Sequence, residues 1–168
     1  MHSPEILIKK KNLMPTIDFD ERFMIQALAE ARKALQADEV PVGCVIVHDN
    51  VIIGRGFNRT EGLQDPTAHA EILAITAASE SLGSWRLAGC TAYSTIEPCA
   101  MCAGALVLGR VDRLVYGAPD PKFGACGSIF NICQNSKLNH RIAVTSGVML
   151  EECASLMRDF FKVKRRDG

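Results

Sequence analysis

Two short segments of the chain contain residue types that bind metal ions and transfer protons. His69 and Glu71 lie at the start of one predicted helix, and Cys99 and Cys102 lie at the start of another. Cysteines three residues apart in a first helical turn project from one face, so both sulfurs can reach a single ion. The positive end of a helix also favours the thiolate, which is the form that binds metal. A histidine from the neighbouring helix would complete a set of three protein ligands.

Three protein ligands predict a catalytic rather than a structural zinc site, because the fourth tetrahedral position is left for water. Zinc lowers the pKa of bound water to about 7, so a nearby carboxylate can take its proton. Glu71 is placed to do so, since it lies two residues beyond His69 and points elsewhere. Once protonated, it could deliver the proton to a ring nitrogen or to departing ammonia. These residues predict one zinc ion (Zn2+) per subunit and hydrolytic deamination.

Each half of this pattern has alternative explanations. His-x-Glu occurs by chance, and Cys-x-x-Cys can bind zinc, act in redox chemistry or pack in a core. A thioredoxin-like pair would follow the first strand of its domain, and a four-cysteine structural zinc site needs a second pair that the other five cysteines do not form. A structural zinc site built from the same ligands remains an alternative. The two motifs together match the H-x-E…P-C-x-x-C signature of zinc deaminases.

The elements that position these residues follow from the spacing of apolar side chains. Asp18 and Glu21 form a candidate capping pair for a helix with apolar residues over 24–35, which Pro41 ends. Alternating strands and helices after it predict a layered α/β domain whose later strands are parallel. In chain order, the pattern predicts a hairpin over 42–47 and 51–56, a helix over 68–81, a strand over 91–95, a helix over 99–108, a strand over 113–116, a short helix over 128–135, a strand over 142–145 and a helix over 150–161.

Length and composition exclude several classes of protein. The 168 residues suit one domain, over 15–168, and 48% hydrophobic with 23% charged residues is typical of a folded globular chain rather than a disordered one. Residues 1–14 show no periodicity and predict a mobile arm. Because 19 basic residues balance 19 acidic ones, any surface for nucleic acid must be local.

Cysteine usage and the lack of targeting segments predict a protein of the reducing cytoplasm. The seven cysteines are an odd number, and the N-terminus lacks the apolar run of about 7–15 residues that a signal peptide needs. No window approaches the roughly 18 apolar residues of a membrane span. The five cysteines outside the Cys-x-x-Cys pair are expected to be small buried hydrophobic residues.

Over about residues 18–166 the sequence resembles bacterial tRNA adenosine deaminases of the TadA type. The zinc motif fixes only the superfamily, whereas the Gly-Ala-x-Asp-x-Lys-x-Gly-Ala stretch and the Phe-Phe tail narrow the resemblance to this family. Pro119 and Phe123 occupy variable positions, and residues 1–14 have no counterpart, with Met14 as an alternative start. The matching motifs lie at 40–43, 56–59, 65–72, 97–105, 117–125, 139–141, 152–154 and 159–161.

The resemblance implies a fold, an assembly and a reaction. The fold is a three-layer α/β/α arrangement with a central five-stranded mixed sheet, as in cytidine deaminases, and the assembly is a homodimer with active sites near the interface. The reaction is hydrolytic deamination of adenosine to inosine at wobble position 34 of tRNA-Arg, with hydroxide on zinc attacking C6. The implied zinc ligands are His69, Cys99 and Cys102, the proton shuttle is Glu71, and the implied substrate contacts are Asn58, the Ala70 backbone amide, Asp120 and Lys122.

The residues alone leave alternatives open for the RNA contacts. Asn58 could stabilise the turn after the second strand, and Asp120, between two prolines, could be a turn residue. His140 could lie in the core, on the surface or against RNA. The basic tail that includes Lys164 and Arg165 could bind phosphates, or it could be a solvated helix end that complements the helix dipole.

Two other functions compete with RNA editing. A salvage enzyme could deaminate free guanine, cytosine or cytidine with the same zinc chemistry, but it would need neither the 120–125 stretch nor the basic tail. A catalytically silent partner could bind RNA for another subunit, but it would have no reason to keep Glu71. The sequence therefore favours an RNA-editing deaminase.

Overall fold

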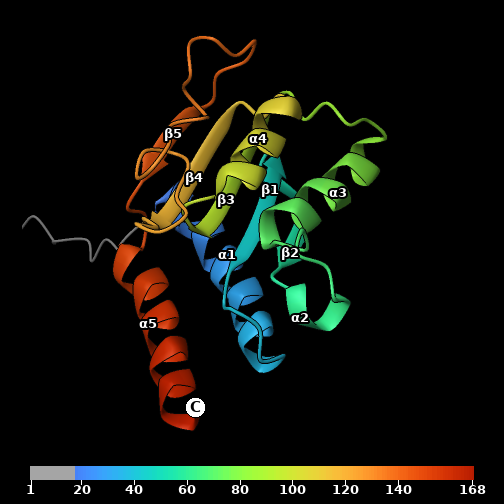
Figure 1. The fold of residues 1–168 in the computed structure, drawn as a ribbon. Coiled ribbons are helices and arrows are strands. Elements are labelled where there is room, and N and C mark those ends of the chain that lie inside the picture. The colour runs from blue at the N-terminus through green and yellow to red at the C-terminus, as the bar shows by residue number, and fades with distance from the viewer. Residues whose placement is uncertain (1–17) are drawn as a thin grey trace, which may run out of the picture.

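A five-stranded mixed sheet forms the middle layer of residues 18–168, the part of the chain that this computed structural model describes (Figure 1). β1 pairs antiparallel with both β2 and β3, whereas β3, β4 and β5 run parallel. The arm predicted over residues 1–14 lies outside the described residues. In the spatial order β2-β1-β3-β4-β5, the strands are β2 (Val51–Phe57), β1 (Gly43–His48), β3 (Cys90–Ile96), β4 (Arg113–Ala118) and β5 (Ala143–Ser146).

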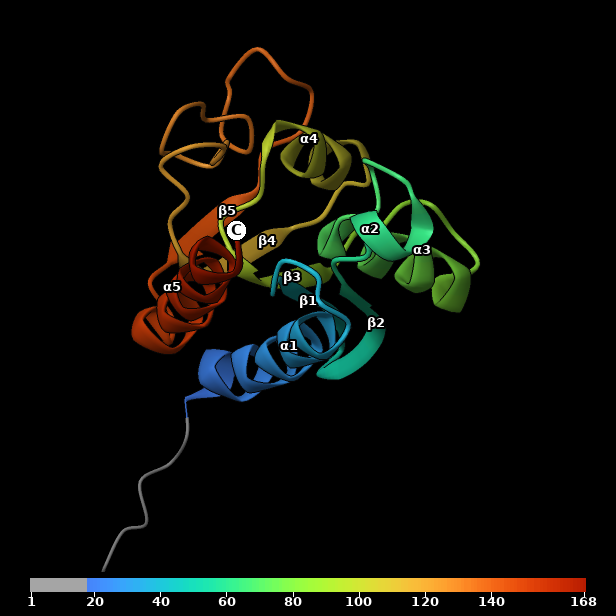
Figure 2. The same ribbon diagram turned by 60° about the horizontal axis from the view of Figure 1, so that its bottom comes forward.

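Helices cover both faces of the sheet, which confirms the predicted three-layer α/β/α fold (Figure 2). One face carries α1 (Phe19–Gln36) and α5 (Leu150–Asp167), and the other carries α3 (Ala70–Leu82) and α4 (Ala100–Leu108). A separate hydrophobic core fills each interface. The short α2 (Thr60–Leu63), which the apolar spacing did not predict, connects β2 to α3. None of the helices in the described part of the chain is long and apolar enough to cross a membrane.

The parallel strands place the functional segments at the carboxyl ends of the strands, on one side of the sheet. β3 ends at Ile96 and β4 at Ala118, and because the strands are parallel, the segments that follow them emerge side by side. The first of these segments leads directly into α4, and the second is the long connection to β5. Ligands of open α/β sheets bind at such carboxyl ends.

Two glycines of β2 bring α3 close to the sheet. A side chain at Gly56 would collide with the backbone of α3 at Ala70 and Ala74, and one at Gly54 would collide with it at Ala74 and Ala78. The absence of these side chains lets α3 pack directly on the strand. The start of α3 is thereby fixed beside the end of β2.

The predicted short helix over 128–135 is wrong. In a helix each N–H would donate to the carbonyl four residues earlier, but here the N–H groups donate to carbonyls before residue 128. Ile129 N–H donates to the Gly124 carbonyl and Ile132 N–H to the Ala125 carbonyl, both at 2.9 Å. Asn131 contributes, because its side-chain oxygen accepts from Gln134 N–H, a local bond that competes with helix formation. The whole connection from β4 to β5 is therefore irregular.

The start of α1 also differs in detail from the expected capping pair. Asp18 does occupy the N-cap position, but its side chain makes no capping hydrogen bond. The other predicted strands and helices are confirmed, with bounds that differ by one or two residues except at the end of α5, which continues six residues beyond the predicted end, to Asp167.

Candidate active site

Two helix N-termini converge at the carboxyl edge of β3. His69 is the N-cap residue of α3, and Cys99 is the N-cap residue of α4. Both have extended backbone, with φ of −76° and −73°, and their carbonyls accept the first helical bonds, from Leu73 N–H and Ala103 N–H. Each N-cap side chain therefore lies at the positive end of its helix. Cys102 lies one turn into α4 on the same side.

These three side chains form one cluster. His69 Nδ1 lies 3.6 Å from Cys99 Sγ and 3.6 Å from Cys102 Sγ. All three potential ligand atoms lie within 4.8 Å of one another. Within residues 18–168, this is the group of His, Cys, Asp and Glu side chains that is placed to hold a metal ion. The cluster was predicted from the sequence, and the fold brings its members together.

The donor atoms and their spacing fit a tetrahedral zinc ion. Zinc binds thiolate at about 2.3 Å and imidazole at about 2.0–2.1 Å, so two ligands at a tetrahedral angle leave sulfur and nitrogen about 3.6 Å apart. This is the separation that His69 keeps from both cysteines. Two thiolates and one neutral imidazole also compensate the charge of a divalent ion in a half-buried site.

Glu71 lies beside the cluster without being part of it. Its Oε2 accepts a hydrogen bond from the Cys102 thiol at 3.5 Å, and its Oε1 lies 3.5 Å from the Ser94 hydroxyl. The side chain is buried, and burial raises the pKa of the carboxyl above its ordinary value. A raised pKa brings a carboxyl closer to the range in which it can both accept and donate a proton.

The two cysteine thiols differ in acidity. The neighbouring Cys102 thiol lowers the pKa of Cys99 to about 4, and a hydrogen bond with His69 acts in the same direction. The neighbouring Cys99 in turn raises the pKa of Cys102, and burial adds to that increase. Cys99 is therefore the more acidic of the two thiols.

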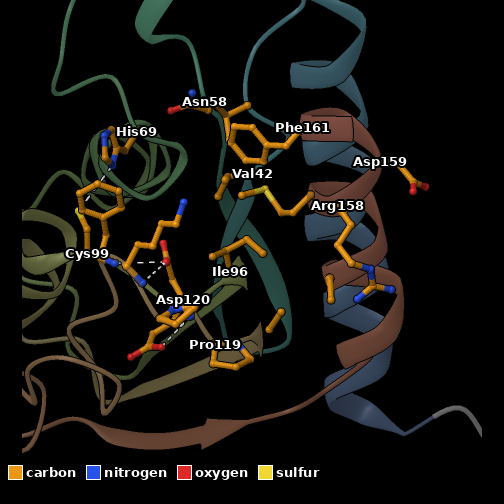
Figure 3. Close-up of a pocket in the computed structure, with 18 of the residues that line it drawn as sticks. Val42, Asn58, His69, Ile96, Cys99, Pro119, Asp120, Arg158, Asp159 and Phe161 are labelled. Atoms are coloured by element: carbon orange, nitrogen blue, oxygen red, sulfur yellow. Dashed lines mark hydrogen bonds between the residues drawn. The ribbon is translucent and has the colours of Figure 1, made fainter. Parts of the chain in front are cut away.

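A cavity of about 1110 Å³ extends from the cluster to the face of α5 (Figure 3). Its floor includes Val42 and Ile96, and Phe161 projects from α5 towards Asn58. One stripe of α5 forms the far wall, with residues at helical spacing that include three cations. The stripe consists of Ala154, Met157, Arg158, Phe161, Lys162 and Arg165.

Asn58 lines this cavity immediately after β2, where a hydrogen-bond relay holds its side chain. Its Nδ2 donates to the Thr60 hydroxyl at 3.4 Å, and Thr60 in turn donates to Glu39 at 3.4 Å. Glu39 is buried and also accepts from the N–H groups of Glu61 and Gly62, the latter at 2.7 Å. Asn58 therefore belongs to a structured turn and faces the cavity at the same time.

The loop after β4 forms another wall, and Asp120 organises its tip. Asp120 Oδ1 accepts from Lys122 N–H at 2.9 Å and from Phe123 N–H at 3.2 Å, the arrangement of an Asx turn. All three residues line the cavity. The turn role considered for Asp120 is therefore observed, and a contact with sugar or phosphate remains a prediction.

Other residues proposed as substrate contacts are placed differently. Ala70 is the first residue of α3, so its N–H has no acceptor within the helix, and Arg165 lines the cavity. Lys164 does not line it, because its Nζ lies 2.7 Å from Asp38 in an ion pair between α5 and the end of α1. His140 bonds to the Val111 carbonyl at 2.7 Å, where β4 and β5 begin, and the fold does not bring it to the cavity.

Sequence reasoning assigned no role to Glu97, which lies next to the cluster. Burial alone would raise the pKa of this carboxyl. Hydrogen bonds from Ser128, Asp120 and Cys126 outweigh burial, so the pKa lies below its ordinary value. The sequence signal that could have identified Glu97 was its position, directly before Pro98 and the metal-ligand candidate Cys99. Ala154 and Met157 of the α5 stripe were also missed, although their helical spacing is visible in the sequence.

Comparison with known proteins identifies relatives with the same domain. Residues 18–165 match the MafB19-like deaminase family. A tRNA-specific adenosine deaminase of Bacillus subtilis (strain 168) is 48% identical over 147 residues, which cover 88% of this chain and 91% of that protein. A solved structure from a study of A-to-I editing by tRNA:A34 deaminases at the wobble position matches with a TM-score of 0.78 at 47% identity, covering 80% of this chain and 98% of the other.

A second kind of relative shares the fold at lower identity. A guanine deaminase from Nitrosomonas europaea matches with a TM-score of 0.74 at 26% identity, covering 95% of this chain and 93% of that one. The same framework therefore occurs in proteins named for different substrates.

The acidity of Cys99 predicts an unusual alkylation profile. In protein treated with a chelator, we expect iodoacetamide to modify Cys99 at a rate that is nearly constant between about pH 5.5 and 8, because a thiol with a pKa of about 4 is already ionised there. An ordinary thiol, with a pKa of about 8.5, would react roughly tenfold faster per pH unit over the same range. Peptide mapping by mass spectrometry measures the rate.

Buried Cys90 is the internal control, because burial raises its pKa to about 11 and it should stay unmodified in the folded protein. Added zinc should protect Cys99. A Cys99 rate that climbs tenfold per pH unit would contradict the prediction.

Proposed function

The chain belongs to the family of tRNA-specific adenosine deaminases, and from that premise we propose that it converts adenosine to inosine at wobble position 34 of tRNA-Arg. One observation carries the proposal: the metal-binding cluster and Glu71 lie at the end of a cavity that continues to a basic helix face. A free base would fill only the end next to the cluster. The remaining wall, with Lys122, Lys162 and Arg165, suits a longer polyanionic substrate.

The cluster supplies the metal ligands of the proposed reaction. His69, Cys99 and Cys102 hold one Zn2+ per subunit, the ion that the donor set and the sulfur–nitrogen spacing fit. A zinc ion bound there provides a Lewis acid that makes water acidic near neutral pH. The reaction adds water at C6 of adenine and releases ammonia, leaving inosine.

Glu71 moves the protons. Its carboxylate takes a proton from the attacking water, gives a proton to the purine ring nitrogen next to C6, and later protonates the departing amino group. Burial excludes bulk water from this carboxyl and raises its pKa, which suits a group that alternates between base and acid. Its position beside Cys102, at 3.5 Å, brings it to the metal ligands without making it one of them.

The wall residues hold the substrate. The Asn58 amide hydrogen-bonds the edge of the purine, assisted by the N–H of Ala70 at the start of α3. Lys122 and Arg165 contact phosphates of the anticodon loop, and Asp120 contacts sugar or holds the turn that presents Lys122. Further contacts by Lys164 and His140 are proposed on sequence grounds, and both would be made outside the cavity.

A substrate comparison tests the proposal. We expect inosine on an anticodon stem-loop of tRNA-Arg with adenosine at position 34, at a rate at least ~100-fold above that for free adenosine, because remote contacts supply binding energy that a nucleoside lacks. Guanine, cytosine and cytidine should release no ammonia. Nuclease digestion followed by chromatography measures inosine. Turnover of a free base or nucleoside without turnover of the stem-loop would assign the protein to salvage instead.

A glutamine at position 71 separates chemistry from metal binding. Glu71→Gln should keep one zinc per chain by elemental analysis but lower kcat by about 10²–10⁴-fold, since the amide cannot shuttle a proton. The matched variant His69→Ala should lose both zinc and activity. A Glu71→Gln enzyme with less than about 10-fold reduced kcat would remove this residue from the mechanism.

We also infer a homodimer, from the outer face of α4. This helix begins at the metal ligands, and its solvent side shows Met101 and Leu108, one heptad apart and 36% and 69% exposed, with Trp85 close to its end at 59%. An exposed apolar stripe of this kind marks an interaction site. A second copy on this face would lie next to the active site.

Sedimentation at micromolar concentration tests the assembly. The wild-type chain should show twice the 18.3 kDa of one subunit, and Leu108→Asp should shift the mass to that of a monomer. Val51→Asp is the control, because Val51 is similarly exposed, at 60%, but lies on the edge strand β2, which does not pack against α4. A monomeric wild type, or a Leu108→Asp variant that stays dimeric, would refute the inferred interface.

A further inference from the structure

Glu97 links the metal-binding segment to the loop after β4. It follows β3 and precedes Pro98 and Cys99, and it is 2% exposed. Its Oε2 accepts from the backbone N–H of Asp120 at 2.9 Å and from the Ser128 hydroxyl. Its Oε1 accepts from the N–H groups of Cys126 and Ser128, both at 3.0 Å. One side chain therefore binds both ends of the 120–128 segment.

The backbone makes the same connection on either side of this carboxylate. Ala125 N–H donates to the Pro98 carbonyl at 2.9 Å, and Cys99 forms an isolated β-bridge with Gly124. A Cβ at position 124 would collide with the Glu97 carboxyl group, so the loop can come this close to the carboxylate only because residue 124 is glycine. The loop is thus built around the carboxylate, against the segment that carries a metal ligand.

Only a carboxylate satisfies this arrangement. Four donors converge on two oxygens, and each oxygen receives at least one backbone N–H. A glutamine would place an NH2 group against one of these N–H donors. The least disruptive orientation keeps the bonds of Oε1 and turns the NH2 towards Asp120, because the Ser128 hydroxyl can rotate to accept. Glu97→Gln therefore releases mainly the Asp120 N–H.

Asp120 connects Glu97 to the residues that face the cavity. Its backbone is held by Glu97, and its own carboxylate holds the N–H groups of Lys122 and Phe123. Both side chains line the cavity, and Phe123 is 68% exposed. The position of these two side chains relative to Cys99 thus depends on one buried carboxylate.

We propose that Glu97 is a positioning residue that holds the 120–128 loop at a fixed place beside the metal ligands, so that Lys122 and Phe123 meet the RNA when the target base is in the site. The inference rests on the proposed function for its substrate. Glu97 touches neither substrate nor metal in this role. Its effect falls on RNA binding rather than on the chemical step.

Steady-state kinetics and amide hydrogen exchange test the proposal on the zinc-loaded enzyme. Glu97→Gln should keep one zinc per chain and raise KM for the anticodon stem-loop by roughly 10-fold, the scale of one lost hydrogen bond to a charged group, with kcat changed less than about 3-fold. The amides of 120–128 should exchange faster, and those of α3 should not. Glu30→Gln is the matched control, because Glu30 is equally buried, at 2%, and pairs with Lys33 and Arg55 far from the loop.

A double-mutant cycle distinguishes positioning from a general loss of stability. If Glu97 acts through the loop, Glu97→Gln should add little to the KM of Lys122→Ala, whereas independent effects would multiply. Should Glu97→Gln not fold, Gly124→Ala provides a second test from the other side of the contact, with the same expected change in KM and exchange. An unchanged KM, a loss confined to kcat, loss of zinc, or full multiplicativity with Lys122→Ala would each overturn the proposal.

Hydrogen exchange keeps this test separate from that of the proposed function. If the wild-type enzyme does not deaminate the stem-loop, the RNA assignment fails, whereas faster exchange of 120–128 in Glu97→Gln would still support the loop anchor. If the stem-loop is deaminated and exchange is unchanged, the anchor fails alone.

Discussion

The site depends on the meeting of two helix N-termini at the carboxyl edge of the parallel strands. His69 and Cys99 are N-cap residues, so their backbone conformation, their helix dipoles and their distance from each other are all set by where α3 and α4 begin. Those starting points are fixed by the sheet, through the glycines of β2 under α3 and the short step from β3 to α4. A shift of either helix by one residue would rotate its ligand by about 100° and destroy the cluster.

Three buried glutamates near the site differ in the number of hydrogen-bond donors around them, and this difference gives them different roles. Glu71 has few hydrogen-bond donors around it, so burial raises its pKa and leaves the carboxyl available for proton transfer. Glu97 and Glu39 each receive several donors, which commits their oxygens to holding a loop and the α2 turn. A carboxylate whose oxygens accept several hydrogen bonds is a poor proton carrier but a firm anchor.

Much of this arrangement could be predicted from the sequence, because local patterns encode it. Periodicity identified every strand and the long helices, and the His-x-Glu and Pro-Cys-x-x-Cys spacings identified the cluster. The one helix that was predicted wrongly lies in the segment between β4 and β5, where the chain satisfies its backbone groups through Glu97, about thirty residues earlier in the sequence. Such a long-range acceptor leaves no trace in local spacing, so Ser128 and its neighbours looked helical. The ion pair that takes Lys164 out of the basic stripe joins residues 126 positions apart and was invisible for the same reason.

The walls of the cavity are anchored separately from its chemical end. Glu39 holds the turn that carries Asn58, Glu97 holds the loop that carries Lys122, and the Lys164–Asp38 pair ties α5 to α1. The side chains of the cluster and of Glu71 contribute to none of these anchors, so the side chains of a wall can change while the proton-transfer geometry stays the same. The structural likeness to a guanine deaminase fits this division, since a shared framework and a shared reaction can serve a different substrate only if the walls differ. In this chain, the segments that line the outer part of the cavity are therefore the ones that can change without moving the cluster of His69, Cys99 and Cys102.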